Sequence, residues 1–293
     1  MRAFTNILLV FLFTACTSVP DERMTSYVDF PETRELTART LSLDSALFRY
    51  PYRVRVQDDK AVVLDLHGTE YFFHAFHYPG FHYLSSFGKR GDAPEEMLSA
   101  ENLRWNGNFL WTLDSNKSEL TRLGFASSGD SLLRLEAVSL DEELLRALDF
   151  VQYDDSTFII PDYSGDGRFC LVSRQGKLLR KIGTVPTANE DALKSARPAL
   201  AQAWRSFIDY NPRNGVLAAA TQLGEVLEIY NLKDSTHIVR IGPNGEPEFQ
   251  ISQGYGIPIG IMGFSDIQVT DSAIYVVFQG RAFKDIMQKA QQG

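Results

Sequence analysis

This chain of 293 residues contains few cysteines, and its basic residues are outnumbered by acidic ones. With two cysteines, Cys16 and Cys170, the sequence cannot form a disulfide-rich scaffold, and Cys170 lies in an apolar run that predicts a buried structural thiol. Lys and Arg number 29 against 37 Asp and Glu, which gives a formal net charge of −8. Nucleic acid is therefore excluded as a general partner, because its binding depends on many cationic contacts to phosphates.

The sequence also lacks the short motifs of common enzyme classes. It contains no Gly-x-Ser-x-Gly elbow, no His-Glu-x-x-His helix, no Cys-x-x-Cys pair and no glycine-rich phosphate loop. His74 and His77 would point to opposite faces of an expected strand and so could not share a metal ion. Residues 162–167 depart from a calcium-binding loop at its later positions and are interpreted as a tight turn. We therefore assign no catalytic residue, no cofactor and no metal ligand.

The amino terminus is predicted to direct export. An apolar run over residues 7–13 is too short to span a bilayer and is typical of a signal peptide over residues 1–15. It ends in the sequence FTAC, which resembles the lipobox of bacterial lipoproteins. The resemblance implies a lipidated Cys16 that anchors the chain at the outer membrane or cell surface, followed by a flexible tether over residues 16–30. The alternative is an ordinary signal peptide with an incidental cysteine.

A repeated unit dominates the rest of the chain. Each copy has an alternating apolar stretch, a turn rich in Asp, Asn, Gly or Ser, and a second apolar stretch, a pattern that predicts a β-hairpin. The five copies span residues 52–65, 102–114, 149–162, 207–221 and 266–279. Corresponding positions lie 47, 49, 58 and 58 residues apart, at Val62, Phe109, Phe158, Val216 and Ile274. Such spacings match the length of a propeller blade.

Further strands are expected after most hairpins. A third strand is predicted at residues 71–76, 120–125, 168–173 and 226–231, and a fourth at residues 83–88, 178–183 and 237–242. Two connections are predicted to contain helices: a helical insertion over residues 188–204, and a shorter helix over residues 140–148. Four strands in each of about five copies favour an all-β propeller over a solenoid or an immunoglobulin-like sandwich.

Several motifs carry a family resemblance. The loop FGKRGDAPEE at residues 87–96, the strand LWTLD at 110–114, the segment FQGR at 278–281 and the lipobox together resemble the TolB-like six-bladed β-propeller lipoproteins of Bacteroidetes-type bacteria. The likeness covers residues 34–283. It implies a six-bladed propeller at the cell envelope, with no catalytic residues to transfer.

The number of repeats departs from that family. Five blades are recognisable in the propeller domain over residues 31–293, so the last blade is expected to be missing or incomplete. Residues 35–44 are expected to form a lone strand of the closing blade or to be disordered. We expect an open or incompletely closed ring whose unpaired strand edges and apolar faces cause dimerisation or aggregation.

Binding is the favoured function. In propellers function lies in loops on a rigid scaffold, here the connections from strand four to strand one and from strand two to strand three. Arginine and tyrosine often anchor interfaces, and the candidate ligand-binding residues are Arg90, Tyr163, Arg168, Gln222 and Arg281. The expected partner is a protein, peptide or glycan of the cell envelope. The alternative is a glycan-active hydrolase or lyase, and a glycosidase would need two carboxylates facing each other across the sugar.

Overall fold

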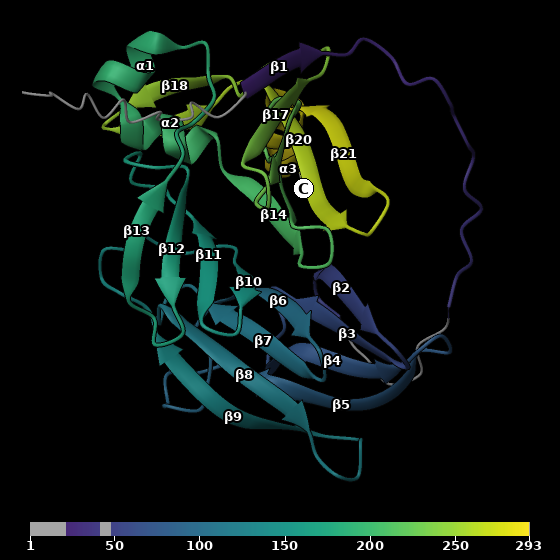
Figure 1. Cartoon of the computed structure of the whole chain (residues 1–293). Helices are drawn as coiled ribbons and strands as arrows, with labels where there is room; N and C mark the ends of the chain where they lie inside the picture. The colour runs from purple at the N-terminus through teal and green to yellow at the C-terminus, as the bar shows by residue number, and fades with distance from the viewer. Residues whose placement is uncertain (1–21, 42–47, 293) are drawn as a thin grey trace, which may run out of the picture.

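The computed structural model describes residues 22–41 and 48–292 and shows a mostly β propeller (Figure 1). Four sheets, each of four antiparallel strands in sequence order, are arranged around a common axis. The strands of the four blades are β2 (Pro51–Gln57), β3 (Lys60–Asp65), β4 (Tyr71–His77) and β5 (His82–Lys89); β6 (Ala100–Asn106), β7 (Phe109–Asp114), β8 (Glu119–Phe125) and β9 (Leu132–Ser139); β10 (Val151–Asp154), β11 (Thr157–Pro161), β12 (Phe169–Ser173) and β13 (Leu178–Ile182); β14 (Ser206–Asn211), β15 (Val216–Thr221), β16 (Val226–Asn231) and β17 (Thr236–Ile241). The predicted fold class is confirmed.

The second strand of each blade is almost wholly buried, because neighbouring blades cover both of its faces. In β3, β7, β11 and β15 every residue after the first is buried. This explains why the second apolar stretch of each repeat is continuous rather than alternating. Leu64 packs with Leu103 between the first two blades, and Trp111 packs edge-on against Phe158, with ring centroids 5.1 Å apart, between the second and third. Each such side chain contributes about 1.5–3 kcal/mol by leaving water.

The fifth predicted hairpin forms a two-stranded sheet in the part of the chain that the structure describes. β20 (Ile261–Val269) pairs antiparallel with β21 (Ile274–Ala282), and Phe264 and Ile267 pack against Phe207 and Ala218 of the fourth blade. A smaller two-stranded sheet precedes it, formed by β18 (Phe249–Ser252) and β19 (Tyr255–Pro258). The structure thus holds four complete blades and a fifth that is reduced to its inner hairpin.

The amino-terminal segment differs from its prediction. β1 (Glu22–Ser26) pairs in parallel with β17 and adds a fifth strand to the outer edge of the fourth blade, within the residues predicted as a flexible tether. Residues 27–41 then run without a strand in an arc toward the first blade, and Leu36 is 94% exposed (Figure 1). The described part of residues 35–44 therefore forms no strand. The predicted signal peptide and Cys16 lie outside the described residues.

The helical insertion is confirmed as two short helices, α1 (Glu190–Ser195) and α2 (Arg197–Ala203). The Asn189 side chain caps α1 by accepting a hydrogen bond from the Ala192 amide at 3.0 Å. The predicted helix over residues 140–148 was wrong, because this segment forms turns. Its candidate cap, Asp141, donates its amide to the Gly176 carbonyl at 2.8 Å, which ties the segment to the next blade.

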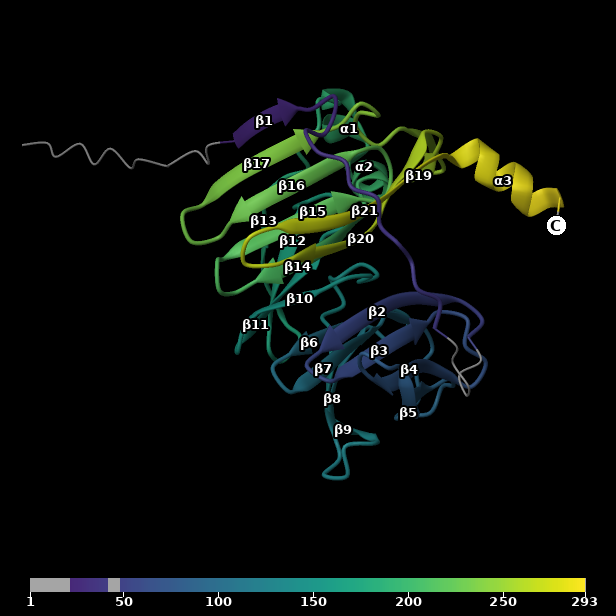
Figure 2. The ribbon, with the colours of Figure 1, turned by 90° about the vertical axis from the view of Figure 1, so that its right-hand side faces the viewer.

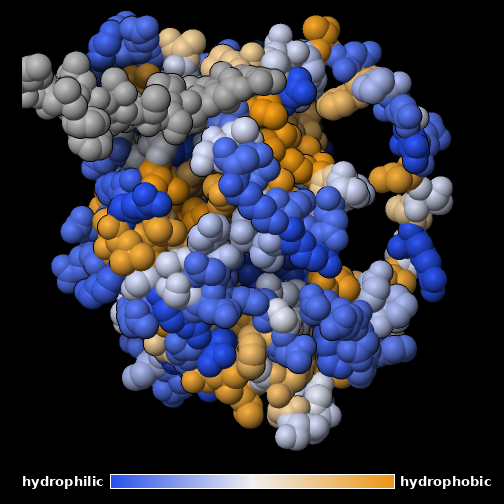
Figure 3. Space-filling view, in the orientation of Figure 1, coloured by the Kyte–Doolittle hydropathy of each residue, from blue (hydrophilic) through white to orange (hydrophobic). Residues whose placement is uncertain are grey.

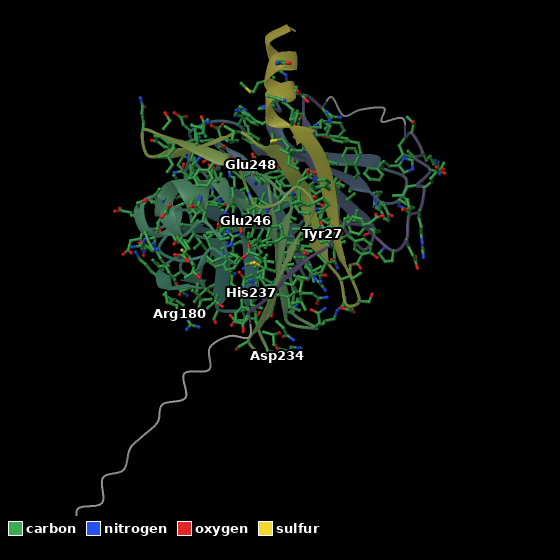
Figure 4. All side chains as sticks on the ribbon, turned by 90° about the horizontal axis from the view of Figure 1, so that it is seen from above. Tyr27, Arg180, Asp234, His237, Glu246 and Glu248 are labelled. Carbon is green, nitrogen blue, oxygen red and sulfur yellow. The ribbon has the colours of Figure 1, made fainter. Side chains whose placement is uncertain are left out.

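The last helix, α3 (Phe283–Gln292), follows β21 directly and projects away from the blades (Figures 2 and 4). None of the helices in residues 22–41 and 48–292 is long and apolar enough to cross a membrane. Glu246 and Glu248, labelled in Figure 4, belong to the connector that follows β17. Glu246 accepts a hydrogen bond from the Ala188 amide at 2.9 Å, which ties the helical insertion to this connector.

Charged side chains from the inner strands meet at the propeller axis. Arg55 donates two hydrogen bonds of 2.9 Å to Asp266. Arg104 donates to Asp209 at 2.6 Å and to Asp149 at 2.9 Å. We call this group the axial network, and its members are Arg53, Arg55, Asn102, Arg104, Asp149, Asp209 and Asp266.

The axial network joins the last hairpin to the first blade. Asp266 of β20 pairs with both Arg53 and Arg55 of β2, so of the two expected forms, an open ring and an incompletely closed one, the structure has the second. Beside this contact, apolar side chains of the two sheets stay exposed: Val54 of β2 is 45% exposed and Val277 of β21 is 57% exposed. Figure 3 shows apolar surface over the region of β20 and β21. The unpaired outer edge that the repeat count predicted is therefore retained.

Candidate functional site at the propeller mouth

A pocket of about 490 Å³ lies at one end of the propeller. Its walls come from the connections between strand four and strand one and between strand two and strand three, which is the face where the binding loops were expected. Its volume is within the range of small-molecule sites. We call it the mouth pocket, and it is lined by Leu145, Arg146, Leu148, Tyr163, Gln202, Arg205, Gln222, Leu223, Tyr255, Gly256, Pro258, Met262 and Phe283.

Tyr163 is held by the tight turn between β11 and β12. The Asp162 carboxylate accepts hydrogen bonds from the amides of Ser164 at 3.0 Å and Gly167 at 2.9 Å, as expected for a turn rather than a calcium loop. Gly165 has a φ of 86°, and a Cβ there would lie 2.5 Å from the backbone of α2. Glycine is required at this position, so the turn fixes Tyr163 rigidly against the helical insertion.

The Tyr163 hydroxyl is buried without a satisfying partner. The residue is 7% exposed, and its hydroxyl has no partner in hydrogen-bonding geometry among the described residues. Burial raises the pKa of Tyr163 to about 12, although both the charge of the nearby Arg205 guanidinium and its polar contact with the hydroxyl act in the opposite direction. The hydroxyl is therefore neutral at ordinary pH. An unpaired buried polar group costs about 1–3 kcal/mol, which a ligand that bonded to it would recover.

Arg205 and Gln222 lie side by side at the base of the fourth blade. The Gln222 amide donates to the Arg205 carbonyl at 2.8 Å, which extends the ladder between β14 and β15 by one pair. The Gly263 amide donates to the Gln222 carbonyl at 2.8 Å, and a Cβ at Gly263 would lie 2.3 Å from the Gly224 carbonyl oxygen. This close approach of β20 fixes both side chains at the pocket.

The charged side chains that line the described mouth pocket are all cationic. Its lining includes two arginines, Arg146 and Arg205, and no Asp or Glu among the described residues. No described carboxylate lies within 4.0 Å of the Arg205 guanidinium, although Arg205 is only partly exposed. Apolar walls surround these cations, including Leu148, Leu223 and Met262. The pocket therefore offers cationic and neutral hydrogen-bond donors next to an apolar surface.

Two of the five predicted ligand-binding residues, Tyr163 and Gln222, meet in the mouth pocket. Sequence reasoning missed Arg205 and Gln202. The register of the predicted hairpin over residues 207–221 was the signal that could have found Arg205. Continuing that antiparallel ladder by one residue pair beyond Ser206 and Thr221 places Arg205 opposite Gln222.

The other three predicted residues lie elsewhere. Arg168 is wholly buried and bonds to Glu228 with an N···O distance of 2.5 Å, so it is a structural residue and was wrongly assigned to a binding surface. Arg90 donates to the Gly68 carbonyl at 3.0 Å and anchors the connector of the first blade. Arg281 is exposed on β21, outside the pocket lining.

Cys170 and the histidines have structural environments. Cys170 is 1% exposed in β12, as predicted, and burial raises the pKa of its thiol to about 12. His74 is buried, with Nδ1 2.8 Å from the Ser86 hydroxyl, whereas His77 is exposed beside Asp59. Across residues 22–41 and 48–292, the structure shows no group of three potential metal-ligating side chains.

Solved structures resemble this fold at low sequence identity. A protein of Bacteroides fragilis assigned as exported aligns with a TM-score of 0.55 and 12% identity, over 88% of this chain and 75% of its own. A member of the DUF4221 family from Bacteroides vulgatus aligns with a TM-score of 0.46 and 12% identity, over 78% of this chain and 67% of its own. None of the curated proteins compared with the chain matches it.

A family model gives the most extensive sequence match. The model describes a TolB-like 6-blade propeller-like protein, and it matches residues 29–293. That range includes all four complete blades, the two-stranded fifth sheet and every residue of the mouth pocket. The chain belongs to the TolB-like 6-blade propeller-like family.

Proposed function

We propose that this protein is an exported, lipid-anchored propeller of the bacterial cell envelope that binds a ligand in the mouth pocket. The lipobox-like sequence and the similarity to a Bacteroides protein assigned as exported support the location. The mouth pocket supports the activity, because loops from separate blades bring three groups into one hollow: a cation with no acidic partner among the described residues, a buried hydroxyl without a well-formed hydrogen bond to them, and an apolar wall. This combination is typical of sites that bind a small or terminal group of a ligand.

The composition of the pocket favours binding over glycan hydrolysis. A glycosidase uses a pair of carboxyl groups as acid and as base or nucleophile. The described lining contributes arginine, glutamine and tyrosine side chains instead. These groups donate hydrogen bonds and hold an anion, but none of them replaces the carboxylate pair at ordinary pH.

A pocket-filling variant tests the proposed function. The protein without its predicted signal peptide and Cys16, its Gln222→Trp variant and a Gln175→Trp control would be applied to arrays of envelope glycans and peptides. Gln222 lines the pocket, whereas Gln175 is exposed in the turn between β12 and β13. We expect the wild type and the control to bind the same array member and Gln222→Trp to lose that binding. Binding that survives in Gln222→Trp, or turnover of the bound member, would contradict the proposal.

A further inference from the structure

We infer that the mouth pocket recognises the terminal carboxylate of a peptide whose last side chain is apolar. This inference rests on the proposed function and specifies the class of ligand. Three features of the described pocket carry it: an arginine without an acidic partner, a buried hydroxyl that makes no hydrogen bond of ordinary geometry, and an apolar wall beside both.

Arg205 provides the charge that a carboxylate would neutralise. The other buried arginines of the propeller have acidic partners: Arg104 pairs with Asp149 and Arg168 pairs with Glu228. Two buried acids lie next to lining residues in the sequence, and both have other partners. Asp149 pairs with Arg104 and accepts a hydrogen bond from the Ile208 amide at 2.9 Å, whereas Asp162 accepts from the amides of Ser164 and Gly167. Arg205 lies beside the Tyr163 hydroxyl and has no acidic partner among the described residues, so its planar guanidinium can still meet a carboxylate in a bidentate arrangement.

The neutral polar groups suit the end of a peptide. Tyr163 is more than nine-tenths buried, and its unpaired hydroxyl both donates and accepts. The Gln202 and Gln222 side-chain amides also line the pocket and match the donors and acceptors of a peptide bond. A free fatty or keto acid would use the arginine but leave these amides without partners.

The apolar wall selects the side chain next to the carboxylate. Leu148, Leu223, Met262 and Phe283 line the same hollow, and about 490 Å³ has room for a large aliphatic group together with one peptide unit. A glycan fits less well, because each sugar hydroxyl donates as well as accepts, and acceptor carboxylates are missing from the described lining. The observations therefore favour a peptide over a uronic acid oligosaccharide.

Calorimetric titration with defined probes tests the inference. N-acetyl-Ala-Leu with a free carboxylate is expected to bind, and its carboxy-terminal amide is expected to bind about 10- to 100-fold more weakly, because a charge-assisted contact is lost. Arg205→Gln should weaken binding of the acid by the same factor and leave the weak binding of the amide unchanged. Arg180→Gln is the matched control, since it removes an exposed arginine from β13, and Arg180 lies at the edge of the molecule in Figure 4.

Several outcomes would overturn the inference. They are equal binding of the acid and the amide, no effect of Arg205→Gln, equal binding of 4-methylpentanoate, and tighter binding of a uronic acid trisaccharide. Arg205 has no ion pair to lose, so the variant should fold, and its thermal unfolding would be recorded beside the control. If N-acetyl-Ala-Leu fails to bind while Gln222→Trp still blocks another array ligand, the inference fails and the proposed function stands.

Discussion

Replacing Arg168 by methionine should destabilise this propeller strongly, even though the sequence placed Arg168 among the ligand-binding residues. The side chains of Arg168 and Glu228 are both 0% exposed. Arg168 Nε lies 2.9 and 3.1 Å from the two Glu228 carboxylate oxygens, and the guanidinium also donates to the Ser206 hydroxyl at 2.6 Å and to the Trp204 carbonyl at 3.2 Å. Methionine would leave a buried carboxylate without its cation.

The size of this destabilisation follows from the cost of keeping the Glu228 carboxylate buried without Arg168. Removing one member of a buried ion pair costs about 3–5 kcal/mol, whereas replacing both members by apolar groups is often nearly neutral. The free energy of unfolding of a domain is about 5–15 kcal/mol, so the single change removes a large share of it. We expect the Arg168→Met, Glu228→Leu double variant to be more stable than Arg168→Met alone, although Ser206 and Trp204 still lose a donor at about 1 kcal/mol each.

Urea unfolding followed by tryptophan fluorescence measures these differences. Arg281→Met serves as the control, because Arg281 is exposed and its loss should change the free energy of unfolding by less than about 0.5 kcal/mol. If Arg168→Met does not fold, Arg168→Lys keeps the charge without the bidentate contact and should lie between the wild type and the methionine variant. An Arg168→Met protein within about 1 kcal/mol of the wild type, or a double variant whose cost is the sum of both singles, would refute the reasoning.

Four further predictions follow from other parts of the chain. Burial tends to raise the pKa of Asp266, but the hydrogen bonds and charges of its two arginine partners outweigh burial and lower the pKa from 3.8 to about 2. The wild type should therefore lose about 2 kcal/mol of stability in urea unfolding as pH falls from about 4 to about 2, and Asp266→Asn should lose less over that range. Cys16→Ala should move the protein from the membrane to the soluble fraction, and unchanged fractionation would argue against lipidation. Cys170 should react with a thiol reagent only after unfolding, and rapid reaction of the native protein would contradict its burial. Val277→Lys should reduce self-association through the exposed strand β21 in analytical ultracentrifugation, whereas an unchanged association constant would exclude this edge as the contact.

The blades could be predicted from the sequence because local chemistry determines them. Asp65 and Asp114 end the second strands of the first two predicted hairpins. In the structure, Asp65 accepts hydrogen bonds from the amides of Arg49 and Tyr50 at 2.8 and 2.7 Å, and Asp114 accepts from the Leu98 amide at 2.6 Å. The same residue type thus secures the chain entering each of these blades. Because this aspartate recurs at the same position of the repeat, the blades can be recognised from a single sequence.

The binding residues were harder to predict because burial and pairing depend on segments far apart in the chain. Arg168 and Arg205 look alike in sequence, because each lies just before a strand. Arg168 follows a turn and precedes the third strand of its blade, whereas Arg205 follows a helix and precedes the first strand of its blade. Glu228, sixty residues farther along, neutralises Arg168 but no described acid reaches Arg205. The turns at residues 140–148 show the same limit, because the hydrogen bond from the Asp141 amide to the Gly176 carbonyl ties this segment to a residue of the next blade.

The distribution of charge explains how an acidic protein can present a cationic mouth. The axial network contains three arginines and three aspartates, so it is balanced and adds little net potential to the mouth pocket. The excess of acids, which gives the chain its formal charge of −8, falls outside the described pocket lining. Arg146 and Arg205 are therefore the charged side chains of the described lining, and they lie beside apolar walls that reduce screening by water. Net charge describes the whole surface, whereas the sign at this site depends on which loops the blades bring together.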